Sequence, residues 1–326
     1  MRVILFNEPG DEAVLRIGEA NEPRCGPRDL RIRVYATAVN RADLLQRRGQ
    51  YPPPPGASSI LGLECAGEIV EVGSKVEGWT AGERVMALLA GGGYAEEVVV
   101  DAGSAMRMPQ SFSWEEGGAF PETFITAFLN IFLLGEPPDG GRVLVHGGGS
   151  GVGTSAISLC REASLPIYIT AGSREKCDRC EALGAAMAIN YRESEFETVL
   201  LEALAGAGVH VILDHLGAEY LQRDLEVLAP EGRIVLIGSM GGTEGTIDTS
   251  LLLRKRARLI GSTLRARPNA EKASIVEKLL VRFGETLQAG RLRPVIDSVF
   301  PLAQAAQAHA RMQSGEHFGK IALRVR

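Results

Sequence analysis

The stretch Arg142-Val143-Leu144-Val145-His146-Gly147-Gly148-Gly149-Ser150-Gly151-Val152-Gly153-Thr154-Ser155-Ala156 decides the fold. An apolar run leads into a glycine-dense turn, and a helical pattern starts directly after the turn. Glycines let a backbone approach a pyrophosphate closely, and a helix N-terminus supplies free N–H groups and the positive end of a dipole. The spacing Gly147-x-x-Ser150-x-x-Gly153 is looser than Gly-x-Gly-x-x-Gly. Because a strand and a helix flank it, this turn predicts a dinucleotide-binding unit, with a ligand-free tight turn as the alternative.

Beyond the turn, the chain continues to alternate between strands and helices. Apolar runs at residues 167–170, 209–213 and 233–237 are separated by helical stretches. This rhythm is typical of βαβ units, in which helices cover both faces of a parallel sheet. We therefore expect an α/β fold with a Rossmann doubly wound parallel sheet. The last sixty residues mix a helix over 270–289 with a strand over 321–325.

The first hundred residues have a different pattern, in which strand-like runs predominate. Alternating or β-branched runs at 31–36, 65–72 and 96–100 lie between glycine clusters and predict strands. The segment Tyr51-Pro52-Pro53-Pro54-Pro55-Gly56 predicts a stiff surface loop, because proline is excluded from helix interiors and inner strands. A β-rich domain thus precedes the βαβ series.

Composition excludes several classes of protein. The 326 residues are 45% hydrophobic and 23% charged, and the formal net charge of -5 argues against a broad basic face for nucleic acid. No apolar run approaches the ~18 residues of a membrane span, and the first ten residues lack the apolar core of a signal peptide. The five cysteines show no disulfide rhythm, and Cys177-x-x-Cys180 lies in a helical pattern without a second pair to complete a zinc site. We expect a cytoplasmic protein that binds neither nucleic acid nor membranes.

The residues after the second strand of the nucleotide-binding unit predict the cofactor. NAD sites place Asp or Glu about 20 residues past the glycines, to hold the ribose 2′-hydroxyl. Here the chain reads Gly172-Ser173-Arg174-Glu175-Lys176, with Ser173 in place of the acid and cations behind it. A hydroxyl and cations suit a 2′-phosphate, so NADPH is favoured over NADH. Glu175 argues the other way, although on a helix its side chain need not face the ribose.

Motifs spread over nearly the whole chain resemble one known family. They are Asn40-Arg41-Ala42-Asp43, Gly49 to Gly56, Leu61-Gly62-Leu63-Glu64 with Gly67, Pro121 to Phe128, the glycine turn and Gly319 to Leu323. They resemble the zinc-independent quinone oxidoreductases of the medium-chain dehydrogenase/reductase superfamily, most of all its tumour-suppressor-inducible branch. The resemblance implies a GroES-like β-rich catalytic domain at 1–122 and 265–326, a Rossmann NADPH-binding domain at 123–264, and an active site in the cleft between them.

The residues at the expected zinc positions predict that no metal is bound. The position of the catalytic cysteine falls in Asn40-Arg41-Ala42-Asp43, which has no cysteine, and the Gly-His-Glu of zinc enzymes reads Gly62-Leu63-Glu64. No cysteine lies between Cys65 and Cys160, so the structural zinc lobe is absent. Without three N or S ligands, a catalytic zinc site cannot be assembled.

The resemblance also assigns site residues. Tyr51, Ser150 and Asn40 are the catalytic candidates, the first two as groups that orient or hydrogen-bond the substrate oxygen. The cofactor-binding candidates are Asn40, Thr126, Ser150, Gly151, Val152, Gly153, Gly172, Ser173, Lys176, Tyr191, Gly238, Ser239, Ser262, Thr263 and Leu264. Purely structural alternatives are a Tyr51 ring packed on the prolines, a turn-capping Asn40 amide, a Thr126 hydroxyl bonded to its own backbone and a solvated Lys176.

The implied activity is NADPH-dependent, metal-independent reduction of quinones by hydride transfer. An NADPH-dependent enone or enoyl (alkene) reductase is an alternative on the same scaffold, and a cofactor-binding protein with weak catalysis is another. The partners we expect are a small-molecule quinone or enone and further copies of the chain. An open edge strand of the Rossmann sheet would allow a homodimer or homotetramer.

Overall fold

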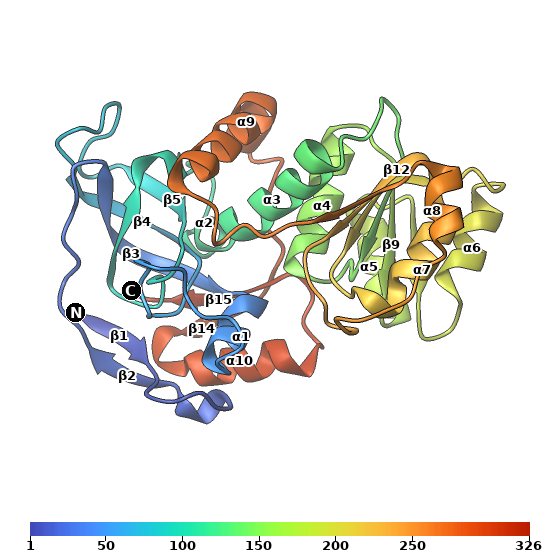
Figure 1. Cartoon of the computed structure of the whole chain (residues 1–326). Helices are drawn as coiled ribbons and strands as arrows, with labels where there is room; N and C mark the ends of the chain where they lie inside the picture. The colour runs from blue at the N-terminus through green and yellow to red at the C-terminus, as the bar shows by residue number, and fades with distance from the viewer. The chain divides into compact units, whose positions relative to one another are not determined.

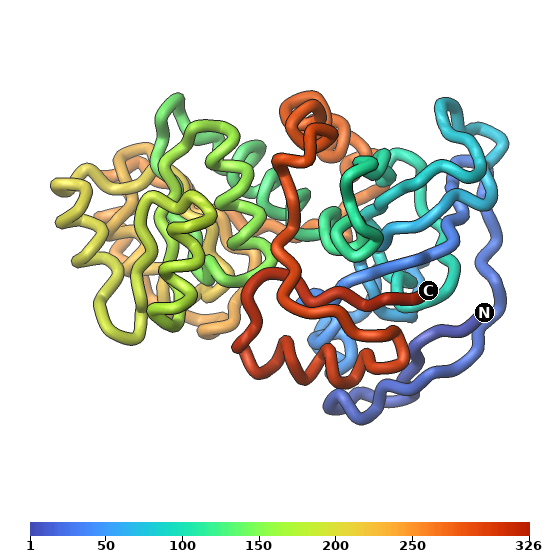
Figure 2. Tube along the Cα trace, turned by 180° about the vertical axis from the view of Figure 1, so that it is seen from behind, coloured from blue at the N-terminus to red at the C-terminus, as the bar shows by residue number.

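The computed structural model describes residues 1–326, and the chain divides into two compact units. We call Met1–Ile125 with Leu264–Arg326 the discontinuous unit, and Thr126–Thr263 the continuous unit. Each unit has its own large sheet, and both chain termini belong to the discontinuous unit (Figures 1 and 2).

The discontinuous unit is rich in β-structure. Its elements are β1 (Arg2–Leu5), η1 (Glu12–Val14), β2 (Arg16–Glu19), β3 (Asp29–Val39), α1 (Arg41–Arg47), β4 (Glu64–Val72), β5 (Arg84–Leu88), β6 (Glu97–Asp101), η2 (Ala102–Ser104), β7 (Ala105–Arg107), α2 (Trp114–Ala119), most of α3 (Pro121–Phe128), α9 (Asn269–Gln288), β14 (Ile296–Pro301), η4 (Leu302–Gln304), α10 (Ala305–Ser314) and β15 (Lys320–Arg324). Its seven-stranded sheet has the order β14-β15-β3-β4-β5-β7, and β6 also pairs with β3. The strand predicted at 31–36 is longer than expected because β3 pairs with β4, β6 and β15 along its length.

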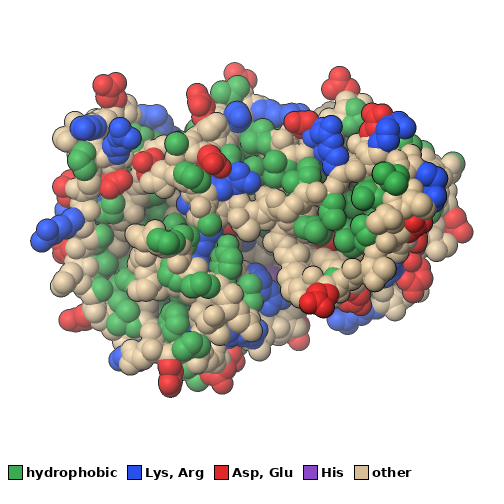
Figure 3. Space-filling view, in the orientation of Figure 1, with side chains coloured by type: hydrophobic (Ala, Val, Ile, Leu, Met, Phe, Trp, Pro, Cys, Tyr) green, Lys and Arg blue, Asp and Glu red, His purple; other side chains and the backbone are tan.

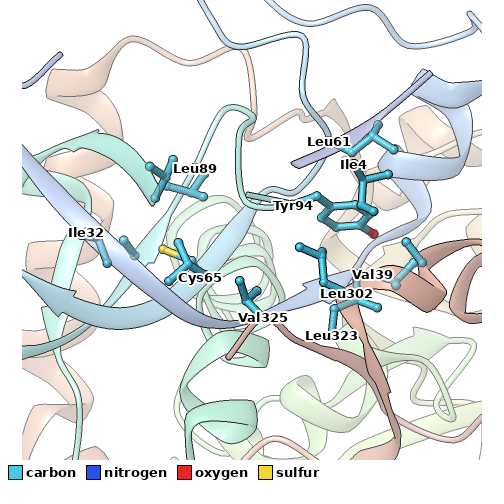
Figure 4. Close-up of a cluster of buried hydrophobic side chains, with 14 of the residues drawn as sticks. Ile4, Ile32, Val39, Leu61, Cys65, Leu89, Tyr94, Leu302, Leu323 and Val325 are labelled. Carbon is cyan, nitrogen blue, oxygen red and sulfur yellow. The ribbon is translucent and has the colours of Figure 1, made fainter. Parts of the chain in front are cut away.

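A hydrophobic cluster fills this unit. Its side chains come from segments far apart in the sequence, and the labelled ones in Figure 4 are Ile4, Ile32, Val39, Leu61, Cys65, Leu89, Tyr94, Leu302, Leu323 and Val325. Burying one such aliphatic side chain contributes about 1.5–3 kcal/mol. The core therefore fixes β15 against β3, which matters below because β15 begins with Lys320.

The continuous unit confirms the predicted α/β sheet. Its elements are the end of α3, η3 (Leu129–Leu134), β8 (Val143–His146), α4 (Gly151–Glu162), β9 (Ile167–Ala171), α5 (Arg174–Leu183), β10 (Met187–Asn190), α6 (Phe196–Ala203), β11 (Val209–Asp214), α7 (Ala218–Val227), β12 (Leu228–Leu236), α8 (Thr249–Lys255) and β13 (Arg258–Gly261). All neighbouring strands are parallel, in the order β10-β9-β8-β11-β12-β13. The order reverses at β8, and ligands of such sheets bind beyond the carboxyl ends of the strands at that point.

Helices cover the continuous sheet as the sequence pattern predicts. Leu144, Ile189, Ile212 and Ile234, from four strands, share a core with side chains of α6 and α7. The helices α4 and α5 contact each other, as do α6 and α7. The sequence analysis did not predict β10 or β13, which are short strands at the two edges of this sheet.

The surface is mixed in charge. On the face drawn in Figure 3, lysine and arginine side chains are interspersed with aspartate and glutamate. None of the helices combines the length and the apolar character that crossing a bilayer requires.

Candidate active-site residues and cofactor-binding edge

The glycine-dense turn connects β8 to α4 at the carboxyl edge of the parallel sheet. Ser150 is the N-cap of α4, and its hydroxyl accepts a hydrogen bond from the Gly153 N–H at 3.0 Å. A Cβ on Gly153 would lie 2.5 Å from the Gly147 carbonyl oxygen, so glycine allows the helix to start against the turn. The N–H groups of Gly151 and Val152 lie in the first helical turn and have no intrahelical acceptor. This helix end therefore has the geometry that binds a pyrophosphate.

His215, which the sequence analysis did not single out, lies next to this turn. A Cβ on Gly147, whose φ is +70°, would lie 2.6 Å from Cε1 of His215. His215 follows β11, the strand beside β8, so the two residues flank the point where the strand order reverses. No short sequence motif joins them, because the contact depends on the pairing of β8 with β11.

A buried hydrogen-bonded network holds His146, the residue that precedes the turn. His146 Nε2 lies 2.8 Å from Asp224 Oδ1, and its Nδ1 lies 3.0 Å from the Thr170 hydroxyl. His146 and Asp224 have no exposed side-chain surface. His146 thus joins β8, β9 and α7 and serves as a structural residue.

The residues expected around the adenosine ribose lie together after β9 and β10. A Cβ on Gly172 would lie 2.7 Å from the Tyr191 hydroxyl, so these two residues are adjacent. Ser173 caps α5, accepting a hydrogen bond from the Lys176 N–H at 3.3 Å. The Glu175 side chain is 81% exposed and forms an ion pair one helical turn further along α5. The Glu175 carboxylate, whose presence in the sequence favoured NAD, is therefore directed along the surface of α5.

Residues after β12 and β13 lie at the same carboxyl edge. A Cβ on Gly238 would lie 2.9 Å from the His215 carbonyl oxygen, and Ser239 follows in the same loop. Ser262 and Thr263 follow β13, and the buried Ser262 hydroxyl makes no hydrogen bond in the protein. An orphaned buried hydroxyl beside a glycine-lined edge is compatible with a bound cofactor.

Two of the expected cofactor contacts lie at the boundaries between the units. Thr126 is the first residue of the continuous unit, and its carbonyl oxygen accepts a hydrogen bond from the Asn130 amide at 2.7 Å. Leu264 is a buried residue that opens the second segment of the discontinuous unit.

The discontinuous unit contains a buried polar cluster built on β3, β4 and β15. The Asn40 amide donates to Glu64 Oε1 at 2.8 Å, and its oxygen accepts from Lys320 Nζ at 2.7 Å. Lys320 Nζ also donates to Glu64 Oε1 at 2.7 Å and to the Val39 carbonyl at 3.0 Å. The lysine and glutamate side chains are 3% and 0% exposed. Asn40 is therefore held in one orientation by a buried ion pair.

Asp43 completes the base of this cluster. Its Oδ2 accepts from the Asn40 N–H at 2.8 Å, and its Oδ1 accepts from the Gly62 N–H at 2.9 Å. Burial raises the pKa of Asp43 to about 6, although these hydrogen bonds act in the opposite direction. The N-cap of α1 is thus held by the Asp43 carboxylate, while the Asn40 side chain faces Glu64 and Lys320.

Glu122 adds to the cluster a carboxyl oxygen that has no hydrogen-bond partner. Its N–H donates to Glu64 Oε2 at 2.9 Å, whereas its own Oε2 is buried without a hydrogen-bond partner. Burial, and then the nearby Glu64 charge, raise the pKa of Glu122 to about 8, against the opposing effects of Lys320 and Arg265. Burial therefore favours the protonated form of Glu122, which can donate a hydrogen bond, over its carboxylate.

Tyr51 lies within electrostatic reach of Glu122. Burial, followed by the Glu122 charge, raises the pKa of the Tyr51 hydroxyl. The Arg265 guanidinium lies 5.5 Å from the Tyr51 ring centroid and donates to the Tyr51 carbonyl oxygen at 3.4 Å. A second Arg265 nitrogen donates to Gln46 Oε1 at 2.6 Å. Arg265 thus holds the proline-loop tyrosine in place, and the tyrosine stays a neutral donor.

Family profiles match both parts of the chain. The profile of the alcohol dehydrogenase GroES-like domain matches residues 26–110, and that of the zinc-binding dehydrogenases matches residues 183–323. A solved structure described as an NAD-dependent alcohol dehydrogenase is 29% identical, with a TM-score of 0.86 and full coverage of both chains. The chain has the medium-chain dehydrogenase/reductase fold.

Two further solved structures are similar to this chain over its whole length. Escherichia coli quinone oxidoreductase, solved with NADPH, is 25% identical with a TM-score of 0.86, and each chain covers 100% of the other. The CurK enoyl reductase is 26% identical with a TM-score of 0.85, covering 100% of this chain and 99% of that one.

Curated relatives differ in how much of their own length this chain matches. The mouse (Mus musculus) synaptic vesicle membrane protein VAT-1 homolog is 29% identical, over 96% of this chain and 80% of its own length. A phenolphthiocerol/phthiocerol polyketide synthase polypeptide of Mycobacterium tuberculosis is also 29% identical. There the match covers 98% of this chain but only 14% of the synthase polypeptide, so this chain spans a small part of that relative.

The side chains present do not fit a zinc ion. No group of three or more His, Cys, Asp or Glu side chains is placed to hold a metal. Around Asn40, the Glu64 carboxylate already has the Lys320 ammonium at 2.7 Å, and a second cation there would be repelled.

The site residues predicted from the sequence fall into two groups. Asn40 and Tyr51 belong to the discontinuous unit, and Ser150 belongs to the continuous unit. Sequence reasoning missed Glu122, Lys320 and Arg265 as site residues, although Glu122 and Lys320 occur in motifs that carried the resemblance. Glu64 and Lys320 are 256 positions apart, and only the pairing of β15 with β3 and of β3 with β4 brings them together.

Proposed function

We propose that the chain is an NADPH-dependent, metal-independent oxidoreductase that reduces quinones by hydride transfer. The observation that carries this proposal is the Glu122 carboxyl, whose buried Oε2 has no hydrogen-bond partner, together with the Tyr51 hydroxyl, since burial raises the pKa of both groups and favours their neutral, hydrogen-donating forms. Reduction of a quinone to a hydroquinone takes up one hydride and one proton. Donors that stay neutral at pH 7 are suited to the oxygen on which negative charge develops.

The carboxyl edge of the continuous sheet supports NADPH as the cofactor. The pyrophosphate would be bound by the first turn of α4, at Gly151, Val152 and Gly153, next to Ser150. The 2′-phosphate would lie among Gly172, Ser173, Lys176 and Tyr191, where Glu175 is directed elsewhere. The orphaned Ser262 hydroxyl at the same edge would gain a hydrogen-bond partner from the bound cofactor.

The protein's own groups would act on the substrate oxygen. When bound, NADPH supplies the hydride. Tyr51 donates a hydrogen bond to the carbonyl oxygen, which stabilises the charge that builds up there. Glu122 transfers its proton and becomes a carboxylate, and Lys320 and Arg265 are the nearby cations that stabilise its charged form. Asn40, held by Glu64 and Lys320, positions this cluster.

The charge already present in the cluster supports metal independence. The Lys320 ammonium supplies the positive charge beside Glu64, and the Asn40 side-chain amide is hydrogen-bonded to both residues. The Tyr51 and Glu122 donors take the place of a Lewis acid in polarising the carbonyl.

A second candidate function is reduction of an enone or enoyl group. The same two donors serve that reaction, in which hydride adds to the β-carbon and a proton adds to the α-carbon. The similarity to the CurK enoyl reductase extends over the whole chain, as does the similarity to the quinone oxidoreductase. A cofactor-binding protein with weak catalysis is the third candidate.

The first test is anaerobic oxidation of NADPH, followed optically, with a panel of quinones and enones and with NADH in parallel. We expect rapid turnover of quinones with NADPH, slow turnover with NADH and no loss of rate after chelation of metals. Turnover of enones alone would replace the quinone assignment with the second candidate. Binding of NADPH without turnover of any acceptor would contradict both reductase assignments, and loss of activity on chelation would contradict metal independence.

A further inference from the structure

A pocket of about 600 Å³ opens in the discontinuous unit, with residues of that unit as its only lining. It lies between the loops 54–58 and 88–92, the strand β6 and the start of α9. Its volume is in the range of small-molecule sites in proteins. None of the cofactor-binding candidates of the continuous unit lines it.

A buried lysine in this pocket has no carboxylate partner. Lys272 is 4% exposed and lines the pocket, and no carboxylate lies within ion-pair distance of its ammonium. Burial lowers its pKa, whereas the charge of Glu122 acts to raise it and that of Arg265 acts to lower it further. Burial of the lysine stem without a paired carboxylate leaves the ammonium at the pocket with an uncompensated charge, which an anion from outside the chain would neutralise.

The N-terminus of α9 adds positive potential to the same pocket. This helix has 20 residues, and its N-cap, Pro268, offers no side-chain cap. The N–H groups of Glu271 and Lys272 bond to the Pro268 carbonyl, whereas Asn269 and Ala270 come first in the helix and have no intrahelical acceptor. Both Pro268 and Asn269 line the pocket, so the positive end of the helix dipole faces it.

Arg265 contributes a second buried cation. It lines the pocket, is 3% exposed and donates to the neutral oxygens of Ala90, Tyr51 and Gln46. Its hydrogen bonds are therefore satisfied, but no carboxylate pairs with its charge. The same side chain packs on the Tyr51 ring, which places the pocket next to the donor cluster.

The acidic residues of the pocket already have partners. Asp29 accepts from the Gly26 N–H at 3.1 Å, and Asp101 accepts from the Gly103 N–H at 3.0 Å. Glu97 forms an ion pair at 3.2 Å with an arginine outside the pocket lining. None of these carboxylates lies within ion-pair distance of Lys272. The remaining walls combine apolar side chains with polar ones such as Ser58 and Ser104, and the apolar side chains include Pro54, Ile60, Leu88, Leu89, Val98 and Val100.

We propose that this pocket binds an organic anion with an apolar body and a single carboxylate or phosphate group. Lys272 pairs with the anionic group, the first N–H groups of α9 hydrogen-bond it, and the apolar walls hold the body. The site goes beyond the proposed reductase activity, because anion binding requires neither NADPH nor turnover.

Calorimetric titration of the full chain with octanoate, octyl phosphate and octanol tests this proposal without measuring activity. We expect at least one of the two anions to bind about tenfold or more tightly than octanol, and the tighter one identifies the preferred group. Lys272→Met should remove that preference, and Lys272→Arg should retain most of it. Lys278→Met is the matched control, because Lys278 is exposed on the same helix.

Reductive methylation of the unmodified protein provides a readout that does not depend on folding of a variant. The bound anion should slow methylation of Lys272, measured by mass spectrometry, and leave Lys278 unaffected. Equal binding of octanol and both anions, or unchanged anion binding by a folded Lys272→Met protein, would overturn the proposal. So would equal methylation of Lys272 with and without the anions.

Discussion

At the scale of single residues, the Tyr51 hydroxyl is the group we expect to matter most for turnover. Tyr51→Phe removes one donor to the developing oxyanion, which corresponds to about 2.7–4 kcal/mol, or roughly 10²–10³ in kcat. NADPH affinity, measured by fluorescence titration, should stay the same. Tyr35→Phe is the matched control, because the Tyr35 hydroxyl bonds to Glu68 outside the cluster. An unchanged kcat for Tyr51→Phe would exclude Tyr51 as a catalytic group.

Glu122 predicts a specific pH dependence. Its folded pKa is about 8 and its ordinary value is 4.5, so the carboxyl donates its proton below pH 8 and loses this ability above it. Turnover should fall as the pH rises through about 8, and Glu122→Gln should abolish that transition while Glu122→Asp retains one. The folded state binds more protons than the unfolded state between pH 4.5 and 8, so this group also makes stability fall with rising pH in that window. Identical pH profiles of wild type and Glu122→Gln would contradict this role.

Lys176 predicts the choice of cofactor. If its ammonium pairs with the 2′-phosphate, Lys176→Met removes a charge-assisted hydrogen bond of about 1.5–3 kcal/mol, or roughly 10- to 100-fold in Kd for NADPH. The Kd for NADH should change little, because NADH lacks that phosphate. Arg179→Met on the same helix is the control. Equal weakening of both cofactors would assign Lys176 a structural role.

The residue scale also shows where sequence reasoning succeeds and where it fails. The glycine turn is local, so Gly147, Ser150 and Gly153 could be recognised from their spacing alone. The donor cluster is not local, because Asn40 and Glu64 meet across 24 positions and Glu64 and Lys320 across 256. Its chemistry depends on burial and strand pairing, which no spacing in the sequence encodes.

At the scale of elements, the buried His309 connects α10 to the rest of the discontinuous unit through hydrogen bonds. Arg47 of α1 donates to Nδ1 of His309 at 3.2 Å, so Nε2 carries the hydrogen, and it lies 3.0 Å from the Tyr94 hydroxyl. Burial, with the Arg47 charge, lowers the pKa of His309 to about 3. The imidazole is therefore neutral in the folded protein.

This network predicts acid sensitivity. The unfolded state binds a proton at His309 below about pH 6.5, whereas the folded state does so only near pH 3. The free energy of unfolding should decrease as the pH falls from 6.5 towards 3, measured by denaturant titration. His309→Gln keeps a donor and an acceptor, and should reduce this slope. A slope that His309→Gln leaves unchanged would assign the acid sensitivity to other groups.

Elements differ in how well the sequence predicts them. The strands β8, β9 and β11 are buried on both faces, and their continuous apolar runs predicted them. The edge strands β10 and β13 have four residues each, and in β13 only the third residue is even partly buried. Such segments carry no periodic signal, because their strand conformation comes from pairing with one neighbour.

At the scale of the whole molecule, β13 provides the open edge that we expect to join two copies of the chain. β12 occupies one side of β13, and Leu259 is 41% exposed. The Ser262 N–H bonds to Leu236 of β12, and strand alternation then directs the Leu259 N–H to the open side. Leu259→Pro should remove this donor, spare the pairing with β12 and convert a dimer to a monomer in light scattering. Leu253→Lys, on an exposed position of α8, is the control, and a wild-type monomer would contradict the expectation.

The discontinuous unit has a consequence for synthesis of the protein on the ribosome. Every strand of the continuous sheet lies between residues 143 and 261, so that sheet can form while translation is still in progress. The other sheet needs β15 between β14 and β3, and β15 is translated after all the other strands. Until then, Glu64 lacks the lysine that neutralises it. We therefore expect the continuous unit to fold before the other sheet is complete, and the unpaired strand edges of that sheet to be the part of the nascent chain most prone to aggregation.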